Sequence, residues 1–149
     1  MSGPSGGAPG MHGGRWLAAV MGLALVLRLI RLGYADYWHD EVHGFVKAEY
    51  LWSVWTTGEF VSNHPPMFVS LLRLWMELGL TGNEFNARLL TALLGLGGVY
   101  AVYFAGSRLL GERAGLLGAF FAAISPFLIH HSQDLKEYIQ LPLVCTLTA

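Results

Sequence analysis

Residues 85–129 have the sequence FNARLLTALLGLGGVYAVYFAGSRLLGERAGLLGAFFAAISPFLI, in which two long apolar stretches are joined by a short polar turn. About 20 consecutive apolar residues cross the hydrocarbon core of a bilayer, so the pattern predicts membrane-spanning helices at about 86–110 and 114–131. Glycines recur along both stretches and favour close helix packing. They are Gly95, Gly97, Gly98, Gly106, Gly115 and Gly118. The segment therefore predicts a helical hairpin in a membrane.

The composition of the whole chain agrees with this interpretation. Of its 149 residues, 54% are hydrophobic and 13% are charged, whereas a soluble domain carries about 25% charged residues. The net charge of −1 argues against nucleic acid as a partner, because nucleic-acid binders present a concentrated basic surface. A single cysteine, Cys145, excludes an internal disulfide framework.

A further apolar stretch at about 16–33 precedes the hairpin and predicts another span. It is interpreted as an uncleaved anchor, because Arg28 and Arg31 follow its apolar core and no signal-peptidase site precedes a polar start. We expect the long side chains of both arginines to snorkel toward the membrane surface.

The two ends of the chain complete the domain prediction. Residues 1–14 are rich in Gly, Pro and Ser and predict a flexible tail. Another span starts at 141 and is cut short, so residues 15–149 are expected to be the N-terminal transmembrane part of a longer protein. The predicted fold class is an all-α, multi-pass membrane protein.

Two shorter helices are predicted between the first span and the hairpin. Residues 41–56 have helical apolar spacing and tryptophans suited to the membrane interface. Residues 65–80 are short for a span, and Ser70, Arg73 and Glu77 form one polar stripe. An interfacial position is favoured for this second helix, with a full crossing as the alternative.

If residues 65–80 do not cross, the loop around Asp40, His64, residues 84–88 and residues 132–138 share one face of the membrane. Counting Lys and Arg alone would place this face in the cytoplasm. A phosphate-binding site would distort that count, so the residues alone leave the orientation open.

Asp40 and Glu41 open the predicted helix 41–56. Acidic residues at a helix start are stabilised by the helix dipole, and this is the simpler interpretation. In the chemical interpretation, a carboxylate at the membrane surface takes a proton from an acceptor hydroxyl.

A metal site is a second interpretation of the same loop. His39 and His43 are four residues apart, so both would lie on one helix face and could bind zinc. The zinc-protease pattern requires Glu directly after the first His, whereas Asp40 stands there. A third ligand would have to come from a carboxylate or another histidine. The available histidines are His64, His130 and His131.

Three other segments carry candidate binding residues. His64 precedes two prolines at the start of a predicted helix. In the simpler interpretation it only marks the helix start, and in the functional one its side chain projects into the same cavity as Asp40. Glu84 and Arg88 are four residues apart, and in the simpler interpretation they form no more than a local ion pair. The segment 132–138 is either an ordinary polar loop or a phosphate site. In the second interpretation, Lys136 supplies the charge and Gln133 and Tyr138 donate hydrogen bonds.

Taken together, the order of these motifs resembles the start of the polyprenyl-phosphate-dependent membrane glycosyltransferases of the C superfamily (GT-C), in particular the protein mannosyltransferase-like and aminoarabinose-transferase-like group. The motifs are Trp38-x-Asp40-Glu41, His64-Pro65-Pro66, Glu84-x-x-x-Arg88-Leu89, Gly111-x-x-x-Gly115, Pro126 and Ser132-Gln133-x-x-Lys136-x-Tyr138.

The resemblance implies an inverting glycosyltransferase of the plasma (inner) membrane, with its N-terminus in the cytoplasm and its active site on the non-cytoplasmic side. Asp40 would be the general base and Glu41 would support it. Donor or acceptor binding would fall to His64, Arg88, Gln133, Lys136 and Tyr138. Members often have Arg where Lys136 stands, and Lys keeps the charge without the bidentate geometry.

The implied partners are a polyprenyl-phosphate-linked sugar donor, a lipid, glycan or protein acceptor, and membrane lipids. The reaction requires no cofactor, although a divalent metal ion is compatible with it. The alternatives to this transferase are a zinc-dependent membrane hydrolase using His39 and His43, and a non-catalytic membrane scaffold.

Overall fold

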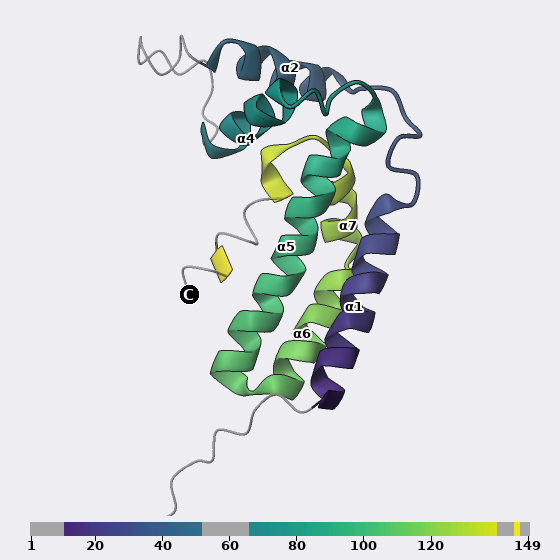
Figure 1. The fold of residues 1–149 in the computed structure, drawn as a ribbon, viewed down its shortest axis with the longest axis vertical. Coiled ribbons are helices and arrows are strands. Elements are labelled where there is room, and N and C mark those ends of the chain that lie inside the picture. The colour runs from purple at the N-terminus through teal and green to yellow at the C-terminus, as the bar shows by residue number, and fades with distance from the viewer. Residues whose placement is uncertain (1–10, 52–65, 140–144, 147–149) are drawn as a thin grey trace, which may run out of the picture.

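The computed structural model describes residues 11–51, 66–139 and 145–146. Every named element in these ranges is a helix (Figure 1). The elements are α1 (Met11–Leu29), α2 (His39–Glu49), α4 (Pro66–Glu77), α5 (Glu84–Leu110), α6 (Glu112–Ile124), α7 (Pro126–Gln133) and the short 3-10 helix η1 (Glu137–Ile139). The prediction of an all-helical chain is confirmed for this part of the sequence.

Helices α1, α5 and α6 lie side by side as a bundle, and α5 packs most extensively against α6 (Figure 1). Glycines allow this close approach, as the sequence predicted. A Cβ atom on Gly106 would lie 2.9 Å from Gly115 Cα, and a Cβ on Gly115 would lie 2.7 Å from Tyr103 O. The turn between the two helices uses Gly111 at a φ of 94°, a conformation that favours glycine.

Only some of the helices have the length and apolarity of a membrane span. Among the described residues, α5 meets that requirement with its 27 residues, which extend about 40 Å at 1.5 Å per residue. Helices α6 and α7 meet it only as a bent pair, with an angle of 57° between them. Helix α1 does not meet it, so the crossing of residues 16–33 remains a prediction. This helix begins at Met11, inside the segment that was expected to be a flexible tail, and residues 1–10 lie outside the described part.

The bend between α6 and α7 divides the segment predicted as one span at 114–131. Pro126 has no N–H to bond Ala122 O, and the Arg28 guanidinium fills that place. Arg28 donates to Ala122 O at 3.5 Å and to Ala123 O at 3.3 Å, and its Nε donates to Ser132 Oγ at 3.1 Å. Arg28 is fully buried, so the prediction that it snorkels is wrong: it turns inward to satisfy the carbonyl groups of the broken helix.

Helices α2 and α4 pack against each other at one end of the bundle (Figure 1). Their shared core contains Ala48, Phe68, Leu72 and Leu135. Helix α4 has 12 residues, which extend about 18 Å and are too few to cross about 30 Å of hydrocarbon unaided. Residues 52–65, which include parts of both predicted interfacial helices, lie outside the described residues.

Candidate active site

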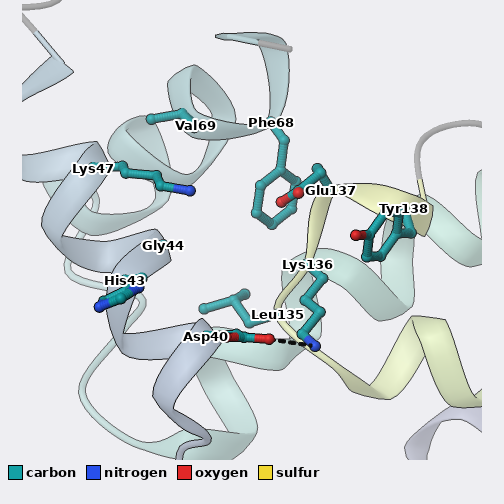
Figure 2. A pocket seen from close by; sticks show the side chains of 10 residues that line it. All are labelled: Asp40, His43, Gly44, Lys47, Phe68, Val69, Leu135, Lys136, Glu137 and Tyr138. Carbon is teal, nitrogen blue, oxygen red and sulfur yellow. Dashed lines mark ion pairs between the residues drawn. The ribbon is translucent and has the colours of Figure 1, made fainter. Parts of the chain in front are cut away.

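Asp40 and Lys136, which are far apart in the sequence, meet at the end of the bundle where α2 lies. Asp40 is in the first turn of α2, and Lys136 follows α7. Their side chains form an ion pair with 3.1 Å between Lys136 Nζ and Asp40 Oδ2 (Figure 2). The Asp40 side chain is 66% exposed and that of Lys136 is 26% exposed. The hydrogen bond and charge of Lys136 lower the pKa of Asp40, and Asp40 in turn raises the pKa of Lys136.

The ion pair borders a cavity of about 210 Å³ (Figure 2). One wall is a face of α2, because positions 40, 43, 44 and 47 are separated by the three or four residues that place them on one side of a helix. These positions are Asp40, His43, Gly44 and Lys47. Phe68 and Val69 of α4 form an apolar wall, and residues 135–138, including Tyr138, form the third. The cavity therefore combines two ammonium groups with the carboxylates of Asp40 and Glu137 and an apolar wall.

A second cavity of about 160 Å³ is also lined by Lys136. Its other lining residues are Trp38, Glu41, His130 and Asp134. His130 Nε2 lies 3.5 Å from Asp134 Oδ2. Lys136 therefore lines both cavities.

Glu41 forms a buried counterpart of the Asp40 pair. Its Oε1 accepts hydrogen bonds from Arg88 Nε at 2.9 Å and Leu135 N at 2.8 Å. Its Oε2 accepts from Arg88 Nη2 at 2.7 Å and Trp38 N at 2.9 Å. Burial raises the pKa of Glu41, but the hydrogen bonds from Arg88, Leu135 and Trp38 outweigh this effect, and the net pKa is lowered. Glu41 therefore stays ionised and fully bonded.

Arg88 has no N–H group left for a ligand. A guanidinium has five N–H donors, and two of those of Arg88 bond Glu41. The other three donate to Leu32 O at 3.2 Å, Ala35 O at 2.7 Å and Asp36 O at 3.1 Å. The predicted local pair of Arg88 with Glu84 is therefore replaced by a pair with Glu41. Arg88, which the resemblance assigned to substrate binding, holds the loop before α2 instead.

The Glu41–Arg88 pair also fixes the spacing of the exposed pair. Glu41 is the neighbour of Asp40, and the N–H that it binds belongs to Leu135, the neighbour of Lys136. Arg88 anchors Glu41, and through Glu41 both segments, to α5. The buried pair thus holds in register the two chain segments that carry Asp40 and Lys136.

Gln133 lies away from both cavities. Its Nε2 is 3.2 Å from Leu27 O, 3.3 Å from Arg28 O and 2.9 Å from Ile30 O. The last carbonyls of a helix lack partners within the helix, so Gln133 caps the end of α1. His64, the remaining predicted binding residue, lies outside the described residues.

The two histidines of the zinc alternative lie close together, with 4.4 Å between the ring centroids of His39 and His43. Within residues 11–51, 66–139 and 145–146, no group of three His, Cys, Asp or Glu side chains is placed to hold a metal ion. The described part of the chain therefore supplies no third ligand to this pair.

Lys47 is a cavity residue that the sequence analysis missed. The apolar positions of this segment recur at helical spacing, and the same spacing places residue 47 on the face of residue 40. That signal was present in the sequence.

Comparison with known protein families gives a match over the second part of the chain. A family model described as dolichyl-phosphate-mannose-protein mannosyltransferase matches residues 63–149, which is more than half of the chain. The match includes Arg88, Lys136 and Tyr138 but begins after Asp40. No curated protein and no solved structure matches.

Proposed function

Since the chain belongs to the dolichyl-phosphate-mannose-protein mannosyltransferase family, which is a family of membrane glycosyltransferases, we propose that it transfers a sugar from a polyprenyl-phosphate donor to an acceptor hydroxyl. The acceptor is a lipid, a glycan or a protein, and the reaction takes place on the non-cytoplasmic side. The finer likeness to aminoarabinose transferases is part of the same proposal.

The observation that carries this proposal is the ion pair between Asp40 and Lys136 at the border of a cavity. A general base must be able to reach the acceptor hydroxyl, and the Asp40 carboxylate is exposed. A cation beside the leaving group stabilises the charge that develops there. One pair of side chains therefore brings together the two chemical groups that the transfer needs.

The proposed reaction is a single displacement at the anomeric carbon. The acceptor hydroxyl gives its proton to the Asp40 carboxylate, and its oxygen bonds the anomeric carbon. The bond from that carbon to the phosphate oxygen breaks, and the electron pair stays on the phosphate. The negative charge of Asp40 thus disappears as a new charge arises on the phosphate, and Lys136 can exchange one partner for the other.

The other predicted residues receive different roles in this proposal. Glu41 and Arg88 are positioning residues, because both are saturated with internal hydrogen bonds. Tyr138 borders the same cavity and can donate a hydrogen bond to the donor. The reaction as written uses no cofactor.

The proposed topology is multi-pass, with the N-terminus in the cytoplasm. Crossings at residues 16–33, at α5 and at the bent α6–α7 pair would place the cavity at the outer surface of the bilayer. The basic residues gathered at this end would then attract an anionic donor.

The test is sugar transfer by the Asp40→Asn variant of the full-length protein in membranes. We expect transfer to fall by about 10²–10⁴-fold, the contribution of general acid–base catalysis, while membrane insertion is unchanged. Asp36→Asn is the matched control, because Asp36 is an exposed acid in the same loop and only its backbone contacts Arg88. Full transfer by Asp40→Asn would contradict the proposal.

A further inference from the structure

Lys47 is the second ammonium group of the cavity that Asp40 borders. It lies seven residues after Asp40 on the same face of α2, and it is partly buried. Figure 2 shows its amine directed into the hollow, across from Lys136. Lys47 lies outside the family match, which starts at residue 63.

The two lysines of the cavity differ in their partners. Lys136 is paired with Asp40 at 3.1 Å. Lys47 has neither an ion pair nor a side-chain hydrogen bond with any residue of the described ranges. An ammonium group is strongly hydrated and gives up its water readily only to an opposite charge or a strong acceptor. Lys47 is therefore the group that an incoming anion can bind without breaking an existing pair.

The remaining lining shows what kind of anion fits. Phe68 and Val69 form an apolar wall of the same cavity, on the helix that faces α2. The Glu137 carboxylate also lines the cavity, and Glu137 has an interaction of its own. A site with one unpaired cation beside an apolar wall suits an amphiphile that has one negative charge and a hydrocarbon chain. A lipid phosphodiester has this chemistry.

We propose that Lys47 binds the phosphodiester of the lipid-linked donor before the reaction, while Lys136 remains paired with Asp40. The inference rests on the proposed function for the identity of the donor. A phosphodiester carries one negative charge, which the single charge of Lys47 balances. The product is a phosphate monoester with a further negative charge, and Lys136 is released to it when Asp40 takes the proton.

This division assigns different kinetic effects to the two lysines. Lys47 contacts the phosphate in the ground state as well as later, so its loss raises KM. Lys136 meets the phosphate only as charge develops, so its loss lowers kcat.

The experiment measures binding to the full-length protein in phosphatidylcholine nanodiscs. The probes are a polyprenyl methyl phosphate, which is a phosphodiester that carries no sugar, and the uncharged polyprenol of the same chain length. The variants are Lys47→Gln, Lys47→Arg and the control Arg113→Gln, which removes an exposed charge at the other end of the bundle. Unfolding temperatures check that each variant is folded.

We expect Lys47→Gln to weaken binding of the phosphodiester by about tenfold, the loss of one charge-assisted contact. Lys47→Arg should retain most of the affinity, and polyprenol binding should not change in any variant. Equal affinity of Lys47→Gln and the wild type for the phosphodiester would overturn the inference. An equal loss of polyprenol affinity would also overturn it, because Lys47 would then act on the fold or the chain site.

Two further outcomes separate this inference from the proposed function. If phosphatidylglycerol displaces the probe as well as unlabelled phosphodiester does, the site binds phospholipid headgroups and the assignment to the donor is overturned. If Lys47 is needed for binding but the wild type transfers no sugar from any polyprenyl-phosphate sugar, the anion site stands and the proposed function fails.

Discussion

Asp40 and Glu41 are adjacent in the sequence, yet their side chains differ sharply in burial and in hydrogen bonding. The Glu41 side chain is 1% exposed and accepts four hydrogen bonds. The Asp40 side chain is 66% exposed and has one ion-pair partner. Each meets a cation from a distant segment, Arg88 for Glu41 and Lys136 for Asp40.

This difference in exposure and bonding suits Glu41 to holding the fold and Asp40 to reacting. A carboxylate that accepts four hydrogen bonds cannot take a proton without leaving buried donors unpaired, and that loss is costly. An exposed carboxylate with one ion-pair partner can change its charge and its contacts at little cost in free energy. Helical rotation produces this contrast, because successive residues of α2 point about 100° apart.

The largest effect on stability is expected when the cation of the buried pair is removed. Arg88→Leu leaves the Glu41 carboxylate buried without its partner, and we expect the free energy of unfolding in detergent to fall by about 3–5 kcal/mol. Lys136→Gln is the matched change in the exposed pair and should leave the unfolding midpoint close to that of the wild type.

A double variant separates the loss of the ion pair from the cost of an unpaired buried charge. Glu41→Leu with Arg88→Leu removes both charges together, so we expect it to be more stable than Arg88→Leu alone. Equal destabilisation by Arg88→Leu and Lys136→Gln would show that the two pairs do not differ in the way described.

A smaller loss of stability is expected from a substitution at Gly95, which lies in the buried part of α5 two helical turns after Arg88. A Cβ on Gly95 would overlap Ser132 Oγ and lie 3.0 Å from Arg28 Nε, two groups held by hydrogen bonds to each other. Gly95→Ala should therefore destabilise the protein by about 1–3 kcal/mol through overpacking.

Gly44 beside the exposed pair provides the control. Its Cβ would lie 3.7 Å from Leu72 Cδ2 and 3.9 Å from Leu135 O, which are ordinary contacts. Gly44→Ala should be neutral or slightly stabilising, since Ala favours a helix over Gly. Unfolding midpoints in detergent compare the two, and a Gly95→Ala protein as stable as Gly44→Ala would contradict the packing described.

The smallest expected effect is the pH dependence of stability. The folded pKa of Glu41 is below its ordinary value of 4.5. A carboxyl whose pKa is lowered by folding stabilises the protein above the unfolded pKa, and this stabilisation is lost as the pH falls through the folded pKa. Unfolding temperature should therefore be steady above about pH 5 and fall below about pH 4.

The Glu41→Gln variant identifies the source of that slope. It should be less stable at neutral pH but should lose less stability on acidification than the wild type. Asp40 also has a lowered pKa, but its exposure makes it a smaller contributor. An unchanged acid slope in Glu41→Gln would exclude Glu41 as the group responsible.

The helices could be predicted from the sequence because the length of each apolar stretch and the positions of its glycines are local features of the chain. The long helix over 86–110, the turn at Gly111 and the close contact of Gly106 with Gly115 all follow from such patterns. The break at Pro126 had a local signal, because proline lacks the N–H that would continue the helix. The inward turn of Arg28 depends instead on packing between α1 and α6, which no local pattern contains.

The candidate site was predictable in part for the same reason. The polar segments at Asp40 and Lys136 are visible as interruptions of apolar sequence, and the structure brings them together. Two features depend on the rotation of each helix against its neighbours. One is which of the two neighbouring carboxylates is buried, and the other is the capping of α1 by Gln133. The position of Lys47 on the same helix face as Asp40 could have been predicted from helical spacing alone.

The central claim is that Asp40 and Lys136 meet at one side of the membrane. Single cysteines introduced as Asp40→Cys, Lys136→Cys and Arg113→Cys, in a background from which Cys145 and any other cysteine have been removed, can be labelled with a membrane-impermeant maleimide on sealed vesicles of known orientation. We predict that positions 40 and 136 label from the non-cytoplasmic side and that position 113 labels from the other. Labelling of positions 40 and 136 from opposite sides would contradict the account.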